Sequence, residues 1–493
     1  MTRINTNVSS LLAQRVLAAQ NRGLVTSLER LSTGLRINRG SDDPAGLIAS
    51  ESLRSEIASI SAAIGNAQRA EQVINVAEGG LQEINNLLVE LQSLIASSAN
   101  EAGVSKAEKE ANQVQVDSIL QTIDRVANAT SFNGTKLLNG SFDYTTTALP
   151  ATLKSVQIDG ARLSDAAGAT IAVNIDVLTS AQNAAVYLST TGTLENGGNG
   201  SITFEITGVD GVQQFTFASG TTQANIVSAI NTFKDALGVS ASIGTVDTDR
   251  VVINSLGYGT AKFVRAKILE GTSDAIIRNE ASTGITGESG FTDFKDTGRD
   301  AIVLINGNQA TTDGLSARVA TDGFDVTINL DGTGAVNTTN GNAKFTITGG
   351  GADFSLSPKV NLAGKVSIGI STVTTGNLGN VDDGFLSKLK AGGAANVING
   401  DLTKGQKIVD AAINQLSKLR GRLGAFQKNV IGATIRSLGV TLENTASAQS
   451  FIRDTDFAAE TAILTRQQIL AQAATQALAI ANAQPQAVLS LLG

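Results

Sequence analysis

The sequence predicts an α+β protein: both chain ends build a discontinuous antiparallel helical bundle or coiled coil, and a β-rich middle region of two subdomains is inserted between them. Near both ends, apolar residues recur at alternating spacings of three and four, the heptad pattern that keeps one stripe of a helix facing a partner helix. Between about residues 142 and 393, short alternating apolar and polar runs, typical of half-buried strands, replace the heptads. At 493 residues, the chain is also too long for a single core.

The longest predicted helix begins at Asp43 and Pro44 and continues to about residue 100 without an internal proline. Asp43 can cap the free amides of the first turn, and Pro44 stands where its missing N–H costs nothing. A helix of roughly 80 Å, at about 1.5 Å per residue, needs a second long helix to cover its apolar stripe. A helix with the same spacing starts near Leu402. The stripes of these two helices form the predicted bundle seam: Ile74, Leu81, Ile84, Leu88, Leu91 and Ile95, with Leu416, Leu419, Leu423, Phe426 and Val430.

Helices are also predicted at the two extreme ends of the chain, over about residues 4–35 and 457–484, and a third helix follows the long one over about 106–128. The two terminal helices have no internal core large enough to order them, so we expect them to be frayed or disordered in an isolated chain. Their apolar stripes form the predicted assembly seam: Leu24, Leu28, Leu31, Leu35, Ile463, Leu470, Ala474, Ala477 and Ala481.

Strands in the middle region are predicted where apolar residues alternate with polar ones, as in 202–206, 324–330 and 345–347, and one helix is predicted around 226–233. About 250 residues are enough for two compact subdomains. The polar, irregular stretch after residue 272 divides them into 142–272 and 273–401.

The chain contains no His, no Cys and no Trp. The missing thiols exclude disulfides and thiolate metal sites, and the missing imidazole excludes Ser-His-Asp and Cys-His catalysis and zinc sites of the His-Glu-x-x-His type. The adjacent carboxylates Asp42 and Asp43 could be paired catalytic acids or a metal site, but their position before Pro44 favours a helix cap. We therefore expect no enzyme activity, no cofactor and no bound metal.

The formal net charge is −7, and no basic block suggests a nucleic-acid partner. Every apolar stretch is interrupted by polar residues, so no membrane span is expected. The N-terminal segment lacks the apolar core and the small-residue cleavage site of a secretory signal. The sequence therefore predicts a cytosolic protein, or one that leaves the cell by a route without a cleaved signal.

Specific motifs stand near both ends of the chain. They are Arg30-Leu-Ser-Thr-Gly-Leu-Arg-Ile-Asn, Asp42-Asp-Pro-Ala-Gly-Leu, Ile452-Arg-Asp-Thr-Asp-Phe-Ala-Ala-Glu and Pro485-Gln-Ala-Val-Leu-Ser-Leu-Leu-Gly. Together they resemble the terminal signatures of bacterial flagellin, over about residues 1–141 and 402–493. In the middle, the stretch 202–264 with its motif Phe215-Thr-Phe-Ala-Ser-Gly-Thr-Thr resembles the small repeat inserted in flagellins and hook-associated proteins.

The resemblance implies a secreted structural subunit that polymerises into the extracellular filament of the bacterial flagellum for swimming motility. By the same resemblance, residues 1–40 and 456–493 form the innermost tube, 41–141 and 402–455 form a bundle of long helices around it, and the middle region faces solvent. Physical reasoning agrees, because terminal helices that pack against several neighbouring copies couple their folding to assembly, and a contact that does not close on itself yields a filament. From the heptad pattern alone, an ordinary coiled-coil dimer with tails is an equal alternative.

The implied partners are further copies of the chain, the filament cap protein, hook-associated junction proteins, an export chaperone at the C-terminal segment and the flagellar type III export apparatus. The flagellin-sensing Toll-like receptor of animals is a further partner, with weak or absent activation expected. Leu94 agrees with the family's recognition pattern, but Glu90 stands where activating members have Arg, and Gln115 where they have Glu. Two alternative functions are a hook–filament junction protein and a filament subunit whose middle domain acts as an adhesin.

Overall fold

The structure is a computed structural model that describes residues 6–100, 103–164, 169–189, 200–244, 250–270, 276–278, 292–332 and 343–490. It divides into two compact units, which are described separately. Unit 1 consists of Met1–Gln72, Ser355–Gly364 and Ala425–Gly493, and unit 2 of Val73–Phe354 and Lys365–Gly424. The predicted α+β class is confirmed, with helices drawn from both chain ends and sheets from the middle of the chain.

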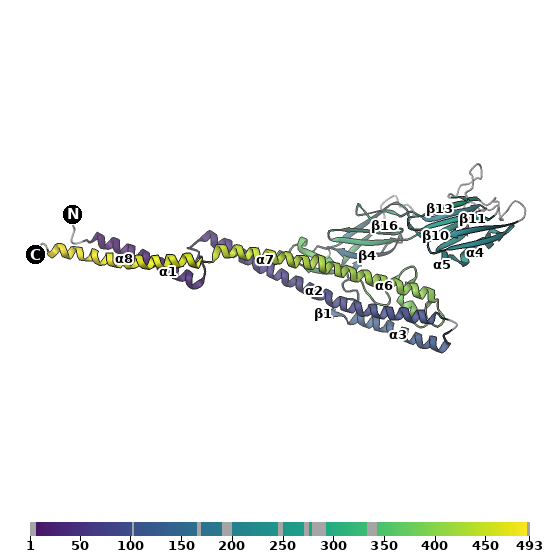
Figure 1. The fold of residues 1–493 in the computed structure, drawn as a ribbon, viewed down its shortest axis with the longest axis horizontal. Coiled ribbons are helices and arrows are strands. Elements are labelled where there is room, and N and C mark those ends of the chain that lie inside the picture. The colour runs from purple at the N-terminus through teal and green to yellow at the C-terminus, as the bar shows by residue number, and fades with distance from the viewer. Residues whose placement is uncertain are drawn as a thin grey trace. The chain divides into compact units, whose positions relative to one another are not determined.

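Unit 1 is helical. Figure 1 shows its first and last helices, α1 (Val8–Thr33) and α8 (Phe457–Ser490), side by side. The unit also holds the first part of α2 (Pro44–Ser98), the π-helical turn η3 (Phe426–Ile431), α7 (Gly432–Arg453) and the 3-10 turn η1 (Leu362–Gly364). In this unit α2 packs on α7 through Ile60, Ala63 and Leu438.

Unit 2 begins with a helical part made of the rest of α2, α3 (Lys106–Ala129) and α6 (Leu402–Ala425). α3 starts with a capping box: Ser105 Oγ accepts the Glu108 amide, and the Glu108 carboxylate accepts the Ser105 amide. Short elements follow the helices: β1 (Ser131–Phe132), β2 (Thr135–Lys136), β22 (Gly379–Asn380), β23 (Gly384–Phe385) and the 3-10 turn η2 (Leu386–Leu389).

The bundle-seam residues lie on α2, on α6 and in the turn η3, and all of them except Val430 are buried. Val430 is half-buried, and its neighbour Ile431 occupies the buried position instead. The reason is the turn η3, because a π turn holds one residue more than an α turn and so delays the next inward position by one.

The chain between β21 (Lys365–Ile368) and α6 packs against α3 rather than forming part of a β-rich surface subdomain. The buried Gln113 side chain donates to the Leu389 carbonyl at 2.9 Å and accepts the Val397 amide at 2.8 Å. Asp124, also on α3, accepts the Thr375 amide at 2.8 Å. This differs from the expected subdomain 273–401, because a Gly-rich segment with little regular structure carries no periodicity that would reveal its partner.

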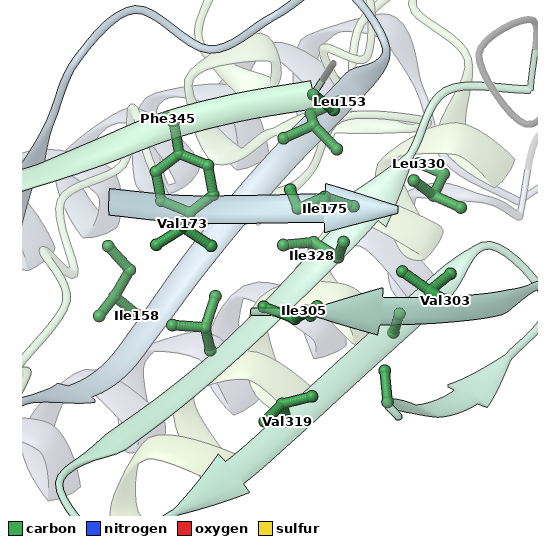
Figure 2. Packing of buried hydrophobic residues seen from close by; sticks show 14 of the residues in the cluster. Leu153, Ile158, Val173, Ile175, Val303, Ile305, Val319, Ile328, Leu330 and Phe345 are labelled. Carbon is green, nitrogen blue, oxygen red and sulfur yellow. The ribbon is translucent and has the colours of Figure 1, made fainter. Parts of the chain in front are cut away.

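The first β core lies between two antiparallel sheets with the strand orders β15-β14-β5-β19-β3 and β16-β17-β18-β4. Figure 2 shows their apolar side chains meeting, with Val173, Ile305 and Phe345 from one sheet and Val319 and Ile328 from the other. The strands are β3 (Tyr144–Thr146), β4 (Leu153–Ala161), β5 (Ile171–Thr179), β14 (Ile302–Ile305), β15 (Asn308–Gln309), β16 (Thr311–Asp313), β17 (Ser316–Thr321), β18 (Phe324–Leu330) and β19 (Ala343–Gly350). β20 (Ala352–Ser355) pairs with β21.

The second β core is also enclosed by two sheets, with the orders β12-β6-β10-β9 and β13-β11-β7-β8. Their strands are β6 (Asn183–Ser189), β7 (Ser201–Thr207), β8 (Val212–Ala218), β9 (Val239–Ile243), β10 (Arg250–Tyr258), β11 (Phe263–Glu270), β12 (Ile276–Arg278) and β13 (Asp293–Thr297). The predicted helix is α4 (Gln223–Thr232), followed by the single turn α5 (Lys234–Leu237). α4 contributes Ile226 and Ile230 to this core.

The two β cores are nested in the sequence. The first uses residues 144–181 and 301–347, and the second uses residues between 184 and 266. The expected order was consecutive, with a boundary near residue 272, and that residue lies outside the described part of the chain. Alternating patterns reveal single strands but not their partners, and β18 pairs with β4, whose Ala161 faces Phe324 across the ladder.

Truncating the bundle seam should destabilise the helical part of unit 2. Leu88 is 0% exposed on α2, so Leu88→Ala should cost about 2–5 kcal/mol of unfolding free energy through lost burial and the cavity left behind. The adjacent Val89 is 52% exposed, and Val89→Ala should cost less than about 0.5 kcal/mol. Urea unfolding followed by far-UV circular dichroism measures both, and equal losses would contradict the inward orientation of Leu88.

Candidate self-assembly interface

α1 and α8 run antiparallel, and polar side chains at their outer ends fix their register. Asn7 caps α1 by accepting the Ser10 amide at 2.9 Å, and its own side-chain amide donates to the Ala481 carbonyl at 2.7 Å. The Ser10 hydroxyl contacts Asn482 Oδ1 at 2.6 Å. One residue, Asn7, therefore both starts α1 and aligns it with α8.

Toward the end of α1 and the start of α8, an ion pair and a close approach at a glycine join the same two helices. The Arg30 guanidinium lies 3.6 Å from the buried Glu460 carboxylate. Gly23 allows the Gln467 side chain to lie against α1, because a Cβ at position 23 would stand 2.9 Å from it.

The side of α8 that faces α1 carries buried or half-buried residues at alternating spacings of three and four: Glu460, Leu464, Gln467, Ala471, Ala474, Leu478 and Ala481. On α1 the buried residues are Ser10 and Ser27, and Leu17, Leu24 and Leu31 between and beside them are half-buried. We call this set the closed stripe. Its fully buried side chains are small or polar and its leucines are only half-buried, so it removes part of its apolar surface from water.

The assembly seam is divided by this arrangement. Ala474 and Ala481 are buried, and Leu24, Leu31 and Leu35 are half-buried. The remaining members are exposed: Leu28, Ile463, Leu470 and Ala477. On α8 the exposed members 463, 470 and 477 are again seven positions apart, so they form a second heptad stripe that the chain itself does not cover.

Further large apolar side chains on the two terminal helices are exposed but do not belong to the predicted assembly seam. They are Val8, Leu11, Leu12, Val16 and Val25 on α1 and Phe457, Ile469 and Ile480 on α8. With the exposed members of the assembly seam, they form what we call the open surface. The seven-residue spacing of positions 11, 18 and 25 is a sequence signal for this surface. The spacing of the leucines from 24 to 35 instead predicts a stripe on a different face of α1.

The terminal motifs, far apart in the sequence, meet where α1 and α8 join α2 and α7. The Arg36 amide donates to the Arg453 carbonyl at 2.7 Å, and the Arg36 guanidinium donates to the Ile452 carbonyl at 2.6 Å. Arg453 in turn pairs with Glu51 on α2 at 2.7 Å. The motifs alone do not reveal this contact, because it joins residues far apart in the sequence.

The two adjacent carboxylates act as caps of two different turns. Asp43 Oδ1 accepts the Gly46 amide at 2.9 Å and caps α2. Asp42 Oδ2 accepts the amides of Arg39 at 2.9 Å and Asn38 at 3.1 Å. These hydrogen bonds, first that of Arg39, hold the pKa of Asp42 below its usual value of 3.8.

The receptor-equivalent positions lie on α2 and α3. Glu90 and Gln115 are exposed, and Leu94 is half-buried. Among the described residues, no three His, Cys, Asp or Glu side chains gather as a metal-ligand group. No helix in the described part of the chain is long and apolar enough to cross a membrane.

Family models match the chain at three places. The bacterial flagellin N-terminal helical region matches residues 4–143, the bacterial flagellin C-terminal helical region matches 406–492, and the flagellin hook IN motif matches 203–257. The chain is 31% identical to the B-type flagellin of Pseudomonas aeruginosa and 31% identical to the flagellin of Salmonella typhimurium. It is 29% identical to flagellin A of Helicobacter pylori, and each of these three alignments covers 99% of both chains.

Acid should open the turn that Asp42 caps. Because the folded state lowers the pKa of Asp42, its stabilising effect is present above the unfolded value and is lost as pH falls through the folded pKa. Hydrogen exchange of the Arg39 amide, measured relative to the Leu88 amide, should therefore lose protection below about pH 4. Asp42→Asn should abolish this pH dependence and Asp43→Asn should leave it, so a dependence that survives in Asp42→Asn would contradict the assignment.

Proposed function

This chain belongs to the bacterial flagellin family and is a secreted structural subunit of the extracellular flagellar filament, and we propose that α1 and α8 are the helices through which its copies join. One observation carries the proposal: between α1 and α8 the fully buried side chains are small or polar and the leucines are only half-buried, whereas many large apolar side chains of both helices are exposed. Exposed apolar surface of this extent on two neighbouring helices marks an interaction site. Further copies of the same chain bury these exposed apolar side chains.

A comparison of free energies favours assembly over a helix pair that is complete by itself. The two terms are the contacts between α1 and α8 and the burial of their exposed apolar side chains. The Arg30–Glu460 ion pair adds little net stability, because removing its charges from water offsets much of their attraction, whereas fully burying one Leu or Ile side chain contributes about 1.5–3 kcal/mol. The exposed side chains therefore hold more free energy than the contacts that align the pair. Assembly releases that free energy and also orders the terminal helices, so folding and polymerisation are coupled.

The layers of the filament follow from this division of surfaces. We place residues 1–40 and 456–493 in the innermost tube, 41–141 and 402–455 in the surrounding helical layer, and the two β cores toward solvent. The buried bundle seam supports this order, because the helices that carry it leave less apolar surface to cover than α1 and α8.

The other partners are those that a filament subunit of this family requires. We propose the filament cap protein and hook-associated junction proteins at the two ends of the polymer, and the flagellar type III apparatus for export. The exposed Ile469 and Ile480 on α8 support a chaperone that covers the C-terminal segment before assembly.

Polymerisation should increase helicity. Purified monomer should form filaments after addition of ammonium sulfate, which strengthens apolar burial, and the far-UV circular dichroism should gain helical signal at the same time. Electron microscopy and circular dichroism on one sample measure both. Filaments without a gain in helicity would contradict the coupling of folding to assembly, and failure to form filaments even from sheared seeds would contradict the proposal itself.

A polar side chain on the open surface should weaken assembly without weakening the fold. Leu11 on α1 is 58% exposed, so Leu11→Gln should raise the critical concentration for polymerisation roughly 5- to 30-fold, the equivalent of about 1–2 kcal/mol of lost burial. Leu178 on β5 is 56% exposed, which makes Leu178→Gln a matched control with an unchanged critical concentration. Sedimentation after assembly measures both, and equal effects would argue against α1 as the joining surface.

Activation of the flagellin-sensing receptor should be weak, because the exposed Glu90 and Gln115 differ in charge from activating members of the family. Glu90→Arg combined with Gln115→Glu should raise potency in a reporter-cell assay. Glu83→Arg, at another exposed position of α2, is the charge-matched control. Potency of the unchanged chain equal to that of an activating flagellin would contradict this interpretation.

A further inference from the structure

A π turn interrupts the helix that continues from α6 into α7. In η3 the Gly432 amide donates to the Gln427 carbonyl, five residues earlier, in place of the α-helical four. The inward position that follows Phe426 is therefore Ile431, five residues on, and Val430 is only half-buried. The turn thus adds one residue between the inward positions of α6 and those of α7.

As a result, the residues that continue the spacing of α6 onto α7 are not those that face inward. The first stripe is buried or half-buried in the structure and consists of Ile431, Ile435, Leu438, Leu442, Thr445, Gln449 and Ile452. The second stripe lies one or two positions earlier and is the one that the spacing of α6 would reach without the π turn: Val430, Ala433, Ser437, Val440, Asn444 and Phe451. Val440 and Phe451 are 59% and 89% exposed. The π turn therefore excludes two large apolar side chains from the interior together with polar ones.

The surroundings of the turn lower the barrier to a change of stripe. On α2, the buried residues that continue from Ala63 are Ala67 and Ala70, whose short side chains interlock little with a facing helix. Gly424 and Gly439 stand before and after η3, and an added Cβ would meet nothing within 4 Å at either position. Packing does not require glycine there, so these residues weaken the helix without a steric reason.

We propose that η3 is a register switch: its conversion to an ordinary α turn exchanges the two stripes of α7 against α2. Losing the extra residue turns α7 by about 100° and moves it by about 1.5 Å relative to the preceding turn. The first stripe holds more Ile and Leu side chains, and the second brings Ser437 and Asn444 inward where the first has Leu438 and Thr445, so the π form is the major state. The switch decides which apolar stripe of α7 is offered to a neighbouring molecule, a property beyond the joining surface on α1 and α8.

Single thiols can test the switch, because the chain has no cysteine of its own. In Val440→Cys the thiol should react rapidly with a labelling reagent. In Leu438→Cys it should react about 10- to 1,000-fold more slowly, in proportion to a minor register populated at about 0.1–10%. In Leu416→Cys, at a buried position of α6 before the turn, the thiol reports general opening of the bundle and should react more slowly still.

Deletion of Asn429, an exposed residue of η3, removes the extra residue while it keeps the first stripe inward. It should slow labelling at position 438 to the rate found at position 416 and leave position 440 fast. Equal rates at 438 and 416 in the full chain would overturn the proposal, as would an unchanged rate at 438 after the deletion. If the deletion variant does not fold, Gly424→Ala and Gly439→Ala decide: slower labelling at 438 supports the switch, and an unchanged rate overturns it.

Discussion

The apolar heptad stripe of a helix must be covered by another helix. In this chain some helices find that cover within the chain and others find it only in part, and most of the structure follows from this difference. α2 meets the requirement within the chain, because Leu81, Leu88 and Ile95 are buried. α6 joins α2 through the ion pair between Arg420 and Glu78 at 2.7 Å. α1 and α8 meet the requirement only in part, since their mutual contact fully buries serine, alanine and glutamate but leaves its leucines half-buried. The same sequence pattern thus gives a folded core in one part and a partly uncovered apolar surface in the other.

The β-rich region depends on a different kind of contact with the helices. Arg422 on α6 pairs with Asp159 on β4 and donates to the Gly369 carbonyl at 2.7 Å. Burial lowers the pKa of Arg422 to about 10, so the guanidinium is still charged near neutral pH. A buried ion pair of this kind tolerates the loss of both partners better than the loss of one, because a single remaining charge has no compensation. It fixes the first β core to α6 at a defined place without adding much stability.

Local signals in the sequence predicted the helices well and their partners poorly. The expected third helix, 106–128, corresponds to α3 (Lys106–Ala129), because caps and apolar spacing act within a few residues. The π turn was not predicted, since Val430 continues the spacing of α6 and only the packing of Ile431 reveals the extra residue. The nesting of the two β cores was not predicted either, because strand pairing joins residues that are far apart in the sequence. On the candidate interface, Ile463 and Leu470 were named, but Leu11 and Ile469 were not, since exposure depends on which face the neighbouring helix takes.

The small and polar side chains of the closed stripe leave the large apolar side chains of α1 and α8 available for the proposed assembly contact. If Glu460, Gln467, Ala474 and Ala481 were leucines, the two helices would bury their largest side chains against each other, and little apolar surface would remain for another copy. The hydrogen bond from Asn7 to the Ala481 carbonyl and that between Ser10 and Asn482 instead favour one register, because a shifted register loses them. In the proposed assembly, alignment comes from these hydrogen bonds within the chain, and the free energy of association comes from the open surface between chains. The terminal helices then have one register when they form, while their ordering and most of the gain in burial come with the next copy.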